Sequence, residues 1–342
     1  MSEHNISQIL NRNLSLLKSN NPLFINLMAD SFISEFLLSY PEAKLSCFNS
    51  NFQQFEQHNK NEQYQSFFGA SYQEKKQHDL VIIQYPKAKA ELSFTLSMLQ
   101  ACVPEQTPII IVGEKNSGIN SSKKSVDTFL THYQKQDSAR HCMLFSGLYK
   151  ELNTFIMDDW FTYYNVEIND ESIKVAALPG VFSQKKLDIG TKVLLDNLPQ
   201  LTPKELLDFG CGAGVIACAL GKVHNACNLT LVDVSALALA SATKTLELNN
   251  LTGQVIASDS LTNIKGHFDT VITNPPFHQG LKTNYQATEF FLAGIYKQIK
   301  MKGSLIVVAN NFLTYQPIMA KNFSRVIEKT NQQGFLVYHC IK

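Results

Sequence analysis

The feature that most constrains the fold is a glycine-rich turn between a short apolar strand and an apolar helix. The run LLDFGCGAGVIACAL (Leu206–Leu220) places Gly210, Gly212 and Gly214 directly after a strand predicted over Glu205–Phe209. Glycines at this spacing let the chain turn sharply at the carboxyl end of a strand, and they let a ligand lie against bare backbone. The turn therefore predicts an α/β domain with a nucleoside site at the edge of its sheet.

Acidic side chains accompany this turn. Asp208 lies at the end of the first strand, and Asp233 ends the next one (Leu229–Val234) about 20 residues on, where a carboxylate can bind both ribose hydroxyls of a nucleoside. Asp259 follows a third strand (Gln254–Ala257) and is placed to accept a hydrogen bond from an adenine amino group. We therefore expect all three carboxylates among the cofactor residues.

Two classes of nucleoside cofactor fit such a turn, and the spacing distinguishes them. A dinucleotide site has G-x-G-x-x-G, which brings a pyrophosphate to the N-terminus of the helix. Here Gly214 comes one residue early and Val215 occupies the dinucleotide position, so the spacing resembles the G-x-G-x-G loop of methyltransferases. S-adenosylmethionine carries a positive sulfonium and no phosphate, which suits a site rich in carboxylates. We expect S-adenosylmethionine, and the alternative is a structural turn without a ligand.

The tetrapeptide NPPF (Asn274–Phe277) follows a further predicted strand, Phe268–Thr273. Ligands of open parallel sheets lie at the carboxyl ends of strands, so this segment should face the same edge as the glycine turn. It resembles the (D/N/S)PP(Y/F) signature of enzymes that methylate amino nitrogens conjugated to a ring or carbonyl. The alternative is a strand-end turn that happens to contain two prolines.

The residue types of this tetrapeptide suit a weakly nucleophilic amine. The side-chain oxygen of Asn274 and the carbonyl of Pro275 can each accept one N–H, which favours a pyramidal nitrogen aimed at the methyl group. Pro275 and Pro276 fix φ, and Phe277 offers a face on which a flipped-out base can stack. Catalysis is then mostly alignment, and no strong base is required. His278 either contacts substrate or only closes the loop.

Strands alternate with helices through the second half of the chain, which predicts a parallel sheet covered on both faces. A fifth strand is expected over Ser304–Ala309. The end differs, because Ser324–Thr330 and Phe335–Ile341 flank a tight NQQG segment. We interpret these two runs as an antiparallel hairpin that closes the sheet.

The first half carries a fainter copy of the second. HDLVIIQYPK (His78–Lys87) aligns without a gap with FDTVITNPPF (Phe268–Phe277), and PIIIVGE (Pro108–Glu114) matches SLIVVAN (Ser304–Asn310) at a similar remove. Such self-similarity predicts a duplicated domain, the alternative being chance likeness between apolar strands. The first copy has neither the glycine turn nor NPPF. We therefore expect it to have the same fold without cofactor binding or catalysis.

Composition supports two domains and excludes several classes of protein. The chain has 342 residues, and we place the boundary near residue 155, giving domains over 1–155 and 156–342. The N-terminus is polar, and no run approaches the roughly 18 apolar residues of a membrane span. Seven cysteines without a CxxC pair and a net charge of +1 favour reduced thiols and no dedicated nucleic-acid module. We expect a cytoplasmic monomer without metal or membrane partner.

The motifs converge on one family. The run PGVFS…LD.GT…LLDFGCGAGV…LVDVS…NPPFHQG, from Leu178 onward, resembles the bacterial small-subunit ribosomal RNA guanine-N2 methyltransferases of the C type. The resemblance implies two tandem Rossmann-like class I methyltransferase domains, the first without cofactor binding and the second with a seven-stranded sheet ending in an antiparallel hairpin. It also implies that the segment with Phe182 and Asp188 closes over the cofactor.

The resemblance further implies the reaction and its partner. The reaction is methyl transfer from S-adenosylmethionine to the exocyclic N2 of a guanine in 16S rRNA, on the assembled 30S subunit. Alternatives are the related guanine-N2 methyltransferase of 23S rRNA and a protein-glutamine N5-methyltransferase acting on release factors. A non-catalytic RNA-binding or assembly factor is a further alternative, which the intact glycine turn, Asp233 and Asn274 oppose.

Overall fold

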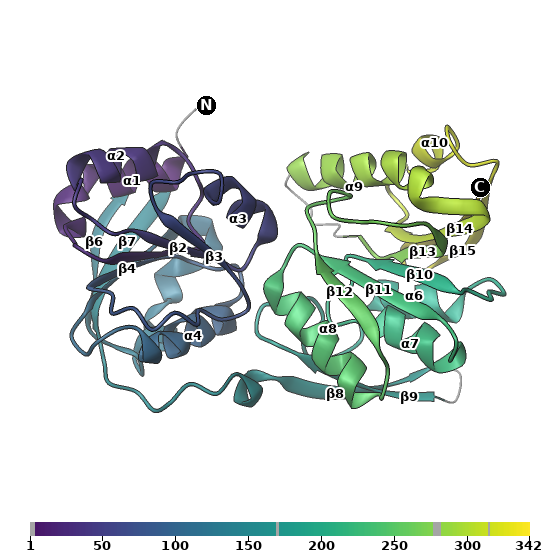
Figure 1. Cartoon of the computed structure of the whole chain (residues 1–342), viewed down its shortest axis with the longest axis horizontal. Coiled ribbons are helices and arrows are strands. Elements are labelled where there is room, and N and C mark those ends of the chain that lie inside the picture. The colour runs from purple at the N-terminus through teal and green to yellow at the C-terminus, as the bar shows by residue number, and fades with distance from the viewer. Residues whose placement is uncertain (1–3, 169–170, 276–281, 314) are drawn as a thin grey trace. The chain divides into compact units, whose positions relative to one another are not determined.

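The computed structural model describes residues 4–168, 171–275, 282–313 and 315–342 (Figure 1). The chain divides into two compact units, Met1–Trp160 and Phe161–Lys342. Each unit contains its own seven-stranded sheet, and the strand order is the same in both.

The sheet of the first unit has the order β3-β2-β1-β4-β5-β7-β6. Its first five strands run parallel, and the hairpin β6–β7 joins β5 antiparallel through β7. The strands are β1 (Pro22–Ile25), β2 (Ser46–Asn49), β3 (Gln65–Phe68), β4 (Leu80–Gln84), β5 (Pro108–Glu114), β6 (Leu130–Ala139) and β7 (Cys142–Tyr149).

Helices cover both faces of this sheet, because the side chains of its central strands alternate between two apolar cores. Phe24 and Ile82 face the core that contains α1 (Asn5–Arg12) and α2 (Ser31–Ser39). Their neighbours Leu23 and Ile83 face the opposite core, with α4. The other helices are α3 (Phe52–His58), α4 (Lys89–Met98) and α5 (Lys123–Val126).

The sheet of the second unit has the order β12-β11-β10-β13-β14-β16-β15, again with five parallel strands and a closing antiparallel hairpin. This confirms the predicted pair of Rossmann-like domains and the terminal hairpin. The strands are β10 (Glu205–Phe209), β11 (Asn228–Asp233), β12 (Gly253–Ala257), β13 (Phe268–Thr273), β14 (Ile299–Asn310), β15 (Arg325–Gln332) and β16 (Phe335–Ile341).

The helices of the second unit also lie on two faces. Leu207, Val271 and Val307 point into one core, together with Phe291 of α9 and Met319 of α10. Figure 1 shows α9 and α10 on this face and α6, α7 and α8 on the other. The helices are α6 (Ile189–Asp196), α7 (Val215–Val223), α8 (Ala236–Leu248), α9 (Lys282–Gly294) and α10 (Gln316–Met319).

A hairpin of β8 (Thr162–Ile168) and β9 (Glu171–Ala177) packs beside α8. Side chains of α8 and its C-cap form hydrogen bonds with the backbone edge of β9, as a third strand would. Ser241 accepts from Leu178 N (3.0 Å), and Thr245 both accepts from the backbone N of Ala176 (3.0 Å) and donates to its carbonyl (3.2 Å). Asn249, at the C-cap, bonds the backbone of Lys174 in the same two-way manner. Residues four apart share a helix face, so one face satisfies the edge of the hairpin.

In the part of the chain that the structure describes, no helix has the length and hydropathy needed to cross a bilayer. All seven cysteines are free, and only Cys227 is more than slightly exposed.

Candidate functional site

The glycine turn joins β10 to α7 in left-handed backbone. The φ angles of Gly210, Gly212 and Gly214 are +68°, +52° and +78°, a region that side chains with a Cβ rarely adopt. A Cβ on Gly214 would lie 3.2 Å from Ala242 Cα, so this glycine lets α7 approach α8 closely. A Cβ on Gly210 or Gly212 would meet nothing within 4 Å. These two glycines therefore present bare backbone to open space, as a ligand-binding turn requires.

Asp233, at the end of β11, is tied to the turn. One carboxylate oxygen accepts from Gly212 N at 3.0 Å, and the other accepts from Ser235 N at 2.9 Å, just before α8. Burial raises the pKa of Asp233 above its ordinary value, while these backbone N–H groups lower it. Each carboxylate oxygen can accept about two hydrogen bonds, so capacity for ligand hydroxyls remains.

Asp208 lies within the core and not at the surface of the turn. Its side chain has no exposed area, and one oxygen accepts from Ala217 N at 3.0 Å in the first turn of α7. Burial raises the pKa of Asp208 to about 7, against the opposing effect of that N–H. Asp208 was predicted among the cofactor residues, and in this structure its fully buried side chain lies beneath the turn and supports the start of α7.

Asp259 lies close to Asp233 along the edge of the sheet. Asp233 pairs with Ala257 in the β11–β12 register, and its carbonyl accepts from Ser258 N at 3.1 Å. Asp259 is the next residue, and it is half-buried. The structure thus brings Asp233, Asp259 and the glycine turn together at the carboxyl ends of neighbouring strands.

The end of β13 lies beside the end of β10, as expected. Thr273 donates its hydroxyl hydrogen to the carbonyl of Phe209 at 2.8 Å, just before the glycine turn. Asn274 follows and is half-buried, and Pro275 is buried. The amide nitrogen of Asn274 donates to Asp188 Oδ2 at 3.1 Å and to Thr191 Oγ1 at 2.9 Å. Pro276, Phe277 and His278 lie outside the described residues.

The segment with Phe182 and Asp188 lies between β9 and α6. Asp188 is the N-cap of α6, and its carboxylate accepts from Thr191 N at 2.9 Å. Phe182 is 57% exposed, and among the described residues no hydrogen bond or ring contact joins it to the glycine turn. Sequence reasoning assigned Asp188 to the cofactor and missed Thr191. The D-x-x-T spacing, typical of a helix N-cap, was the available signal.

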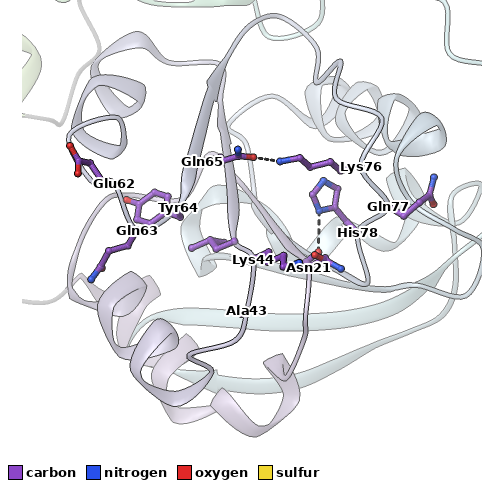
Figure 2. Close-up of a pocket in the computed structure, with 11 residues that line it drawn as sticks. Asn21, Ala43, Lys44, Glu62, Gln63, Tyr64, Gln65, Lys76, Gln77 and His78 are labelled. Atoms are coloured by element: carbon purple, nitrogen blue, oxygen red, sulfur yellow. Dashed lines mark hydrogen bonds between the residues drawn. The ribbon is translucent and has the colours of Figure 1, made fainter.

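A hollow of about 650 Å³ lies in the first unit (Figure 2). Its lining residues lie at or just before the starts of β1 to β4, so the hollow opens at the amino ends of these strands. The turn that follows β1, which corresponds to the glycine turn after β10, lies at the opposite edge of the sheet. His78 there bonds the carbonyl of Asn21 and the hydroxyl of Tyr72, both at 3.0 Å. The lining comprises Asn21, Ala43, Lys44, Leu45, Glu62, Gln63, Tyr64, Gln65, Lys76, Gln77 and His78.

Among the residues that the structure describes, no group of three or more His, Cys, Asp or Glu side chains is arranged to hold a metal ion.

The fold and the glycine turn define an S-adenosylmethionine-dependent methyltransferase. The Methyltransferase small domain family matches residues 172–339, and the Methyltransferase small domain N-terminal family matches residues 7–164. Both copies of the repeat are thus matched by methyltransferase-type families.

Full-length relatives narrow the class. The ribosomal RNA small subunit methyltransferase C of Colwellia psychrerythraea is 47% identical over 348 residues, covering 99% of this chain and 98% of that protein. The protein of the same name from Aliivibrio fischeri strain ES114 is 39% identical over 98% of each chain. The chain belongs to the ribosomal RNA small subunit methyltransferase C family, which confirms the resemblance found in the motifs.

A solved structure shows the same two-domain fold. The T. thermophilus 16S rRNA N2 G1207 methyltransferase, in complex with AdoMet and guanosine, superimposes with a TM-score of 0.84 over 99% of this chain and 92% of that one. Sequence identity is 19%, so this likeness establishes the architecture of both units and leaves the site residues to be argued from the chain itself.

Proposed function

We propose that the chain transfers the methyl group of S-adenosylmethionine to the exocyclic N2 of a guanine in 16S rRNA. The observation that carries the proposal is the amide of Asn274, held at the carboxyl edge of the sheet with its nitrogen donating to Asp188 and Thr191. This leaves the amide oxygen to accept from a substrate amine. The names of the relatives and of the T. thermophilus structure support small-subunit RNA and guanine N2.

The residues at the turn fit S-adenosylmethionine. Open space beside Gly210 and Gly212 leaves room for a ligand against the backbone, and the carboxylate of Asp233 borders that turn. We assign the cofactor to Gly210, Gly212, Gly214, Asp233 and Asp259. When bound, S-adenosylmethionine supplies an electrophilic methyl group on a positively charged sulfur. Nearby carboxylates suit that charge.

The segment after β13 orients the amine. Asn274 Oδ1 and the Pro275 carbonyl each accept one N–H of the exocyclic amine, which draws its lone pair out of conjugation with the ring. Buried Pro275 has a fixed φ, and the proline that follows it in the sequence restricts its ψ, so the carbonyl needs little reorganisation during the reaction. The residues thus act through alignment and exclusion of water. Our assignments of Pro276 as a second brace and Phe277 as the stacking face remain predictions from the sequence.

The two halves divide the work. We assign catalysis to 156–342 and assign to 1–155 a supporting role without cofactor, because the first copy has no glycine turn. The partner we propose is the assembled 30S subunit in the cytoplasm. We propose that the protein binds it as a monomer. Sedimentation of the protein with and without subunits tests the monomer and the partner.

The experiment is methyl transfer from radiolabelled S-adenosylmethionine to five substrates taken from cells that lack this gene. These are 30S subunits, 50S subunits, naked 16S RNA, naked 23S RNA and release factor, with the modified product identified by mass spectrometry. N2-methylguanosine in small-subunit RNA alone is the expected result. Label in 23S RNA or in a glutamine of release factor would overturn the substrate assignment and support the corresponding alternative.

A further inference from the structure

The side chain of Asn274 is held by two residues of another segment, 83 and 86 positions away in the sequence. Asp188 Oδ2 accepts from the amide nitrogen at 3.1 Å, and Thr191 Oγ1 accepts from it at 2.9 Å. The two N–H bonds of the amide group are therefore both engaged on the protein side.

The chemistry of Asp188 decides which way the amide faces. A carboxylate can only accept hydrogen bonds, whereas an amide has a donating end and an accepting end. If the Asn274 amide turned over, its oxygen would face the carboxylate oxygen and lose the bond to Asp188. Thr191 reinforces the choice, because its hydroxyl donates towards Asp188 Oδ2 at 3.5 Å and so offers its lone pairs to Asn274.

Asp188 is itself held in place. The same oxygen accepts from Thr191 N at 2.9 Å, as the N-cap of α6. Gly190 makes room for this arrangement, because a Cβ there would lie 3.0 Å from Asp188 Oδ2 and 2.8 Å from Phe335 Cε1 of β16. The run Asp188–Thr191 is thus a short rigid bracket at the start of a helix, aimed at the end of β13.

We propose that Asp188 and Thr191 are positioning residues that fix the amide of Asn274 with its oxygen towards the substrate. This inference rests on the proposed function, since it concerns how Asn274 receives an amine. It replaces the cofactor role that the sequence suggested for Asp188.

The bracket also contributes to selectivity. An amide oxygen accepts from an N–H, so the fixed orientation binds an exocyclic amino group, whereas the turned amide would present N–H groups and repel it. Xanthosine, with a carbonyl in the same place, and inosine, with only a hydrogen there, offer no exocyclic N–H donor to this oxygen. The N-terminus of α6 therefore contributes to selecting an amine, together with the tetrapeptide.

The test compares variants that keep the helix cap and change the bracket. Serine is a good N-cap, but its shorter side chain does not reach Asn274, so Asp188→Ser should lower kcat on the order of 10- to 100-fold. Thr191→Val, which is isosteric and lacks the hydroxyl, should also lower kcat. The conservative variants Asp188→Asn and Thr191→Ser keep an accepting oxygen in place and should recover most of that loss. Cofactor affinity, measured by calorimetry, and Tm should stay at wild-type values in all four.

A double-mutant cycle separates positioning from other roles. In an Asn274→Ala background, Asp188→Ser should cause no further fall in kcat, because the residue it acts through is gone. Asp196→Asn is the matched control, since it changes an exposed carboxylate on the same helix that pairs with Lys192. Its kcat should equal that of the wild type.

Two results would overturn the inference. If Asp188→Ser weakens cofactor binding and leaves kcat unchanged, Asp188 is a cofactor residue, as its motif suggested. If Asp188→Ser lowers kcat equally with and without Asn274, it acts through another group. A wild-type enzyme that makes no N2-methylguanosine would instead contradict the proposed function, and the five-substrate assay shows that separately.

Discussion

Asn26 in the first sheet and Gly210 in the second occupy the same place and share the same left-handed backbone, with φ of +56° and +68°. Each residue directly follows the strand that comes first along the chain in its sheet, β1 or β10. Each donates its backbone N–H to the neighbouring strand at 2.8 Å, to Phe48 O in one case and to Val232 O in the other. The duplication therefore extends beyond strand order to the first residue of the ligand-binding turn.

The side chain of Asn26 explains why only one copy binds a cofactor in our proposal. Its Oδ1 accepts from Ser50 N at 2.8 Å and from the Ser50 hydroxyl at 3.2 Å, whereas beside Gly210 there is open space. At this position the first unit thus has a hydrogen-bonded side chain, whereas the second unit has bare backbone beside open space. An asparagine adopts left-handed backbone more readily than other non-glycine residues, so the first unit can form this turn without a glycine.

The first prediction follows from the equivalence of Asn49 and Asp233, which end β2 and β11 in matching register. Calorimetry should show one S-adenosylmethionine bound per chain. Asp233→Ala should weaken binding by about 1.5–3 kcal/mol, the scale of a charge-assisted hydrogen bond. Asn49→Ala is the matched control and should leave affinity unaltered. Two bound cofactors per chain would contradict the division of roles between the halves.

A second equivalence shows how much of the fold the sequence could reveal. The gap-free alignment of the two halves placed Asp79 opposite Asp269. In the structure Asp79 accepts from the two backbone N–H groups just before β1, and Asp269 accepts from those of Lys204 and Glu205 at the start of β10. The sequence repeat therefore includes the aspartates that bond the start of a neighbouring strand, in addition to the apolar residues of the strands.

Other elements could not be predicted, for physical reasons. The strands β2 and β3 have four residues each, too few for a periodic pattern to stand out. The strand β6 is largely polar and was not predicted. Ser241 and Thr245 look like the solvent face of α8 but are fully buried, because they bond the edge of β9. Such a role depends on a partner about 65 residues away, which no local pattern reveals.

The glycines of the turn should separate ligand binding from folding. Gly210→Ala puts a Cβ into open space at positive φ, so it should cost about 1–2 kcal/mol of stability through backbone strain and strongly reduce cofactor affinity. Gly214→Ala carries similar strain and also a contact of 3.2 Å with Ala242, so its loss of stability should be larger. Chemical denaturation and calorimetry on both variants check this, and an equal loss of stability would refute the packing argument for Gly214.

Asn274→Ala should lower kcat by about 10²–10³-fold, the scale for removing one preorganised hydrogen-bond partner of a reacting group. Cofactor affinity should change little, because Asn274 is assigned to the substrate. Single-turnover methyl transfer and calorimetry measure the two quantities. Asn322→Ala, which removes an exposed hydrogen bond to Ala293 O, is the control for the amide substitution. Turnover equal to that of the wild type would remove Asn274 from the reaction.

Thr245→Val should destabilise the second unit by about 1–3 kcal/mol, because it leaves the buried backbone N–H and carbonyl of Ala176 without their partner. The matched control is Thr243→Val on the exposed side of the same helix, where the hydroxyl donates to Leu239 O. Urea unfolding followed by circular dichroism compares the two. A control variant as unstable as Thr245→Val would point to helix propensity as the cause.

Asp208 gives the chain a pH dependence of stability with a definite sign. Its pKa is raised by burial to about 7 in the folded state, above the ordinary value of 3.8 that we take for the unfolded chain. The folded state therefore binds this proton more tightly, so the stabilising effect of protonation is present in acid and is lost as pH rises through 7. Between pH 6 and pH 8 this one group should reduce the free energy of unfolding by about 1 kcal/mol.

Asp208→Asn should abolish that part of the pH dependence, because an amide of the same shape does not titrate and can still accept from Ala217 N. The measurement is urea unfolding at pH 6 and pH 8 for wild type and variant, since the contributions of other groups cancel in the difference. The variant should gain stability relative to the wild type on going to pH 8. A constant difference between the two proteins would mean that Asp208 does not titrate between pH 6 and pH 8 in the folded state, contrary to the prediction.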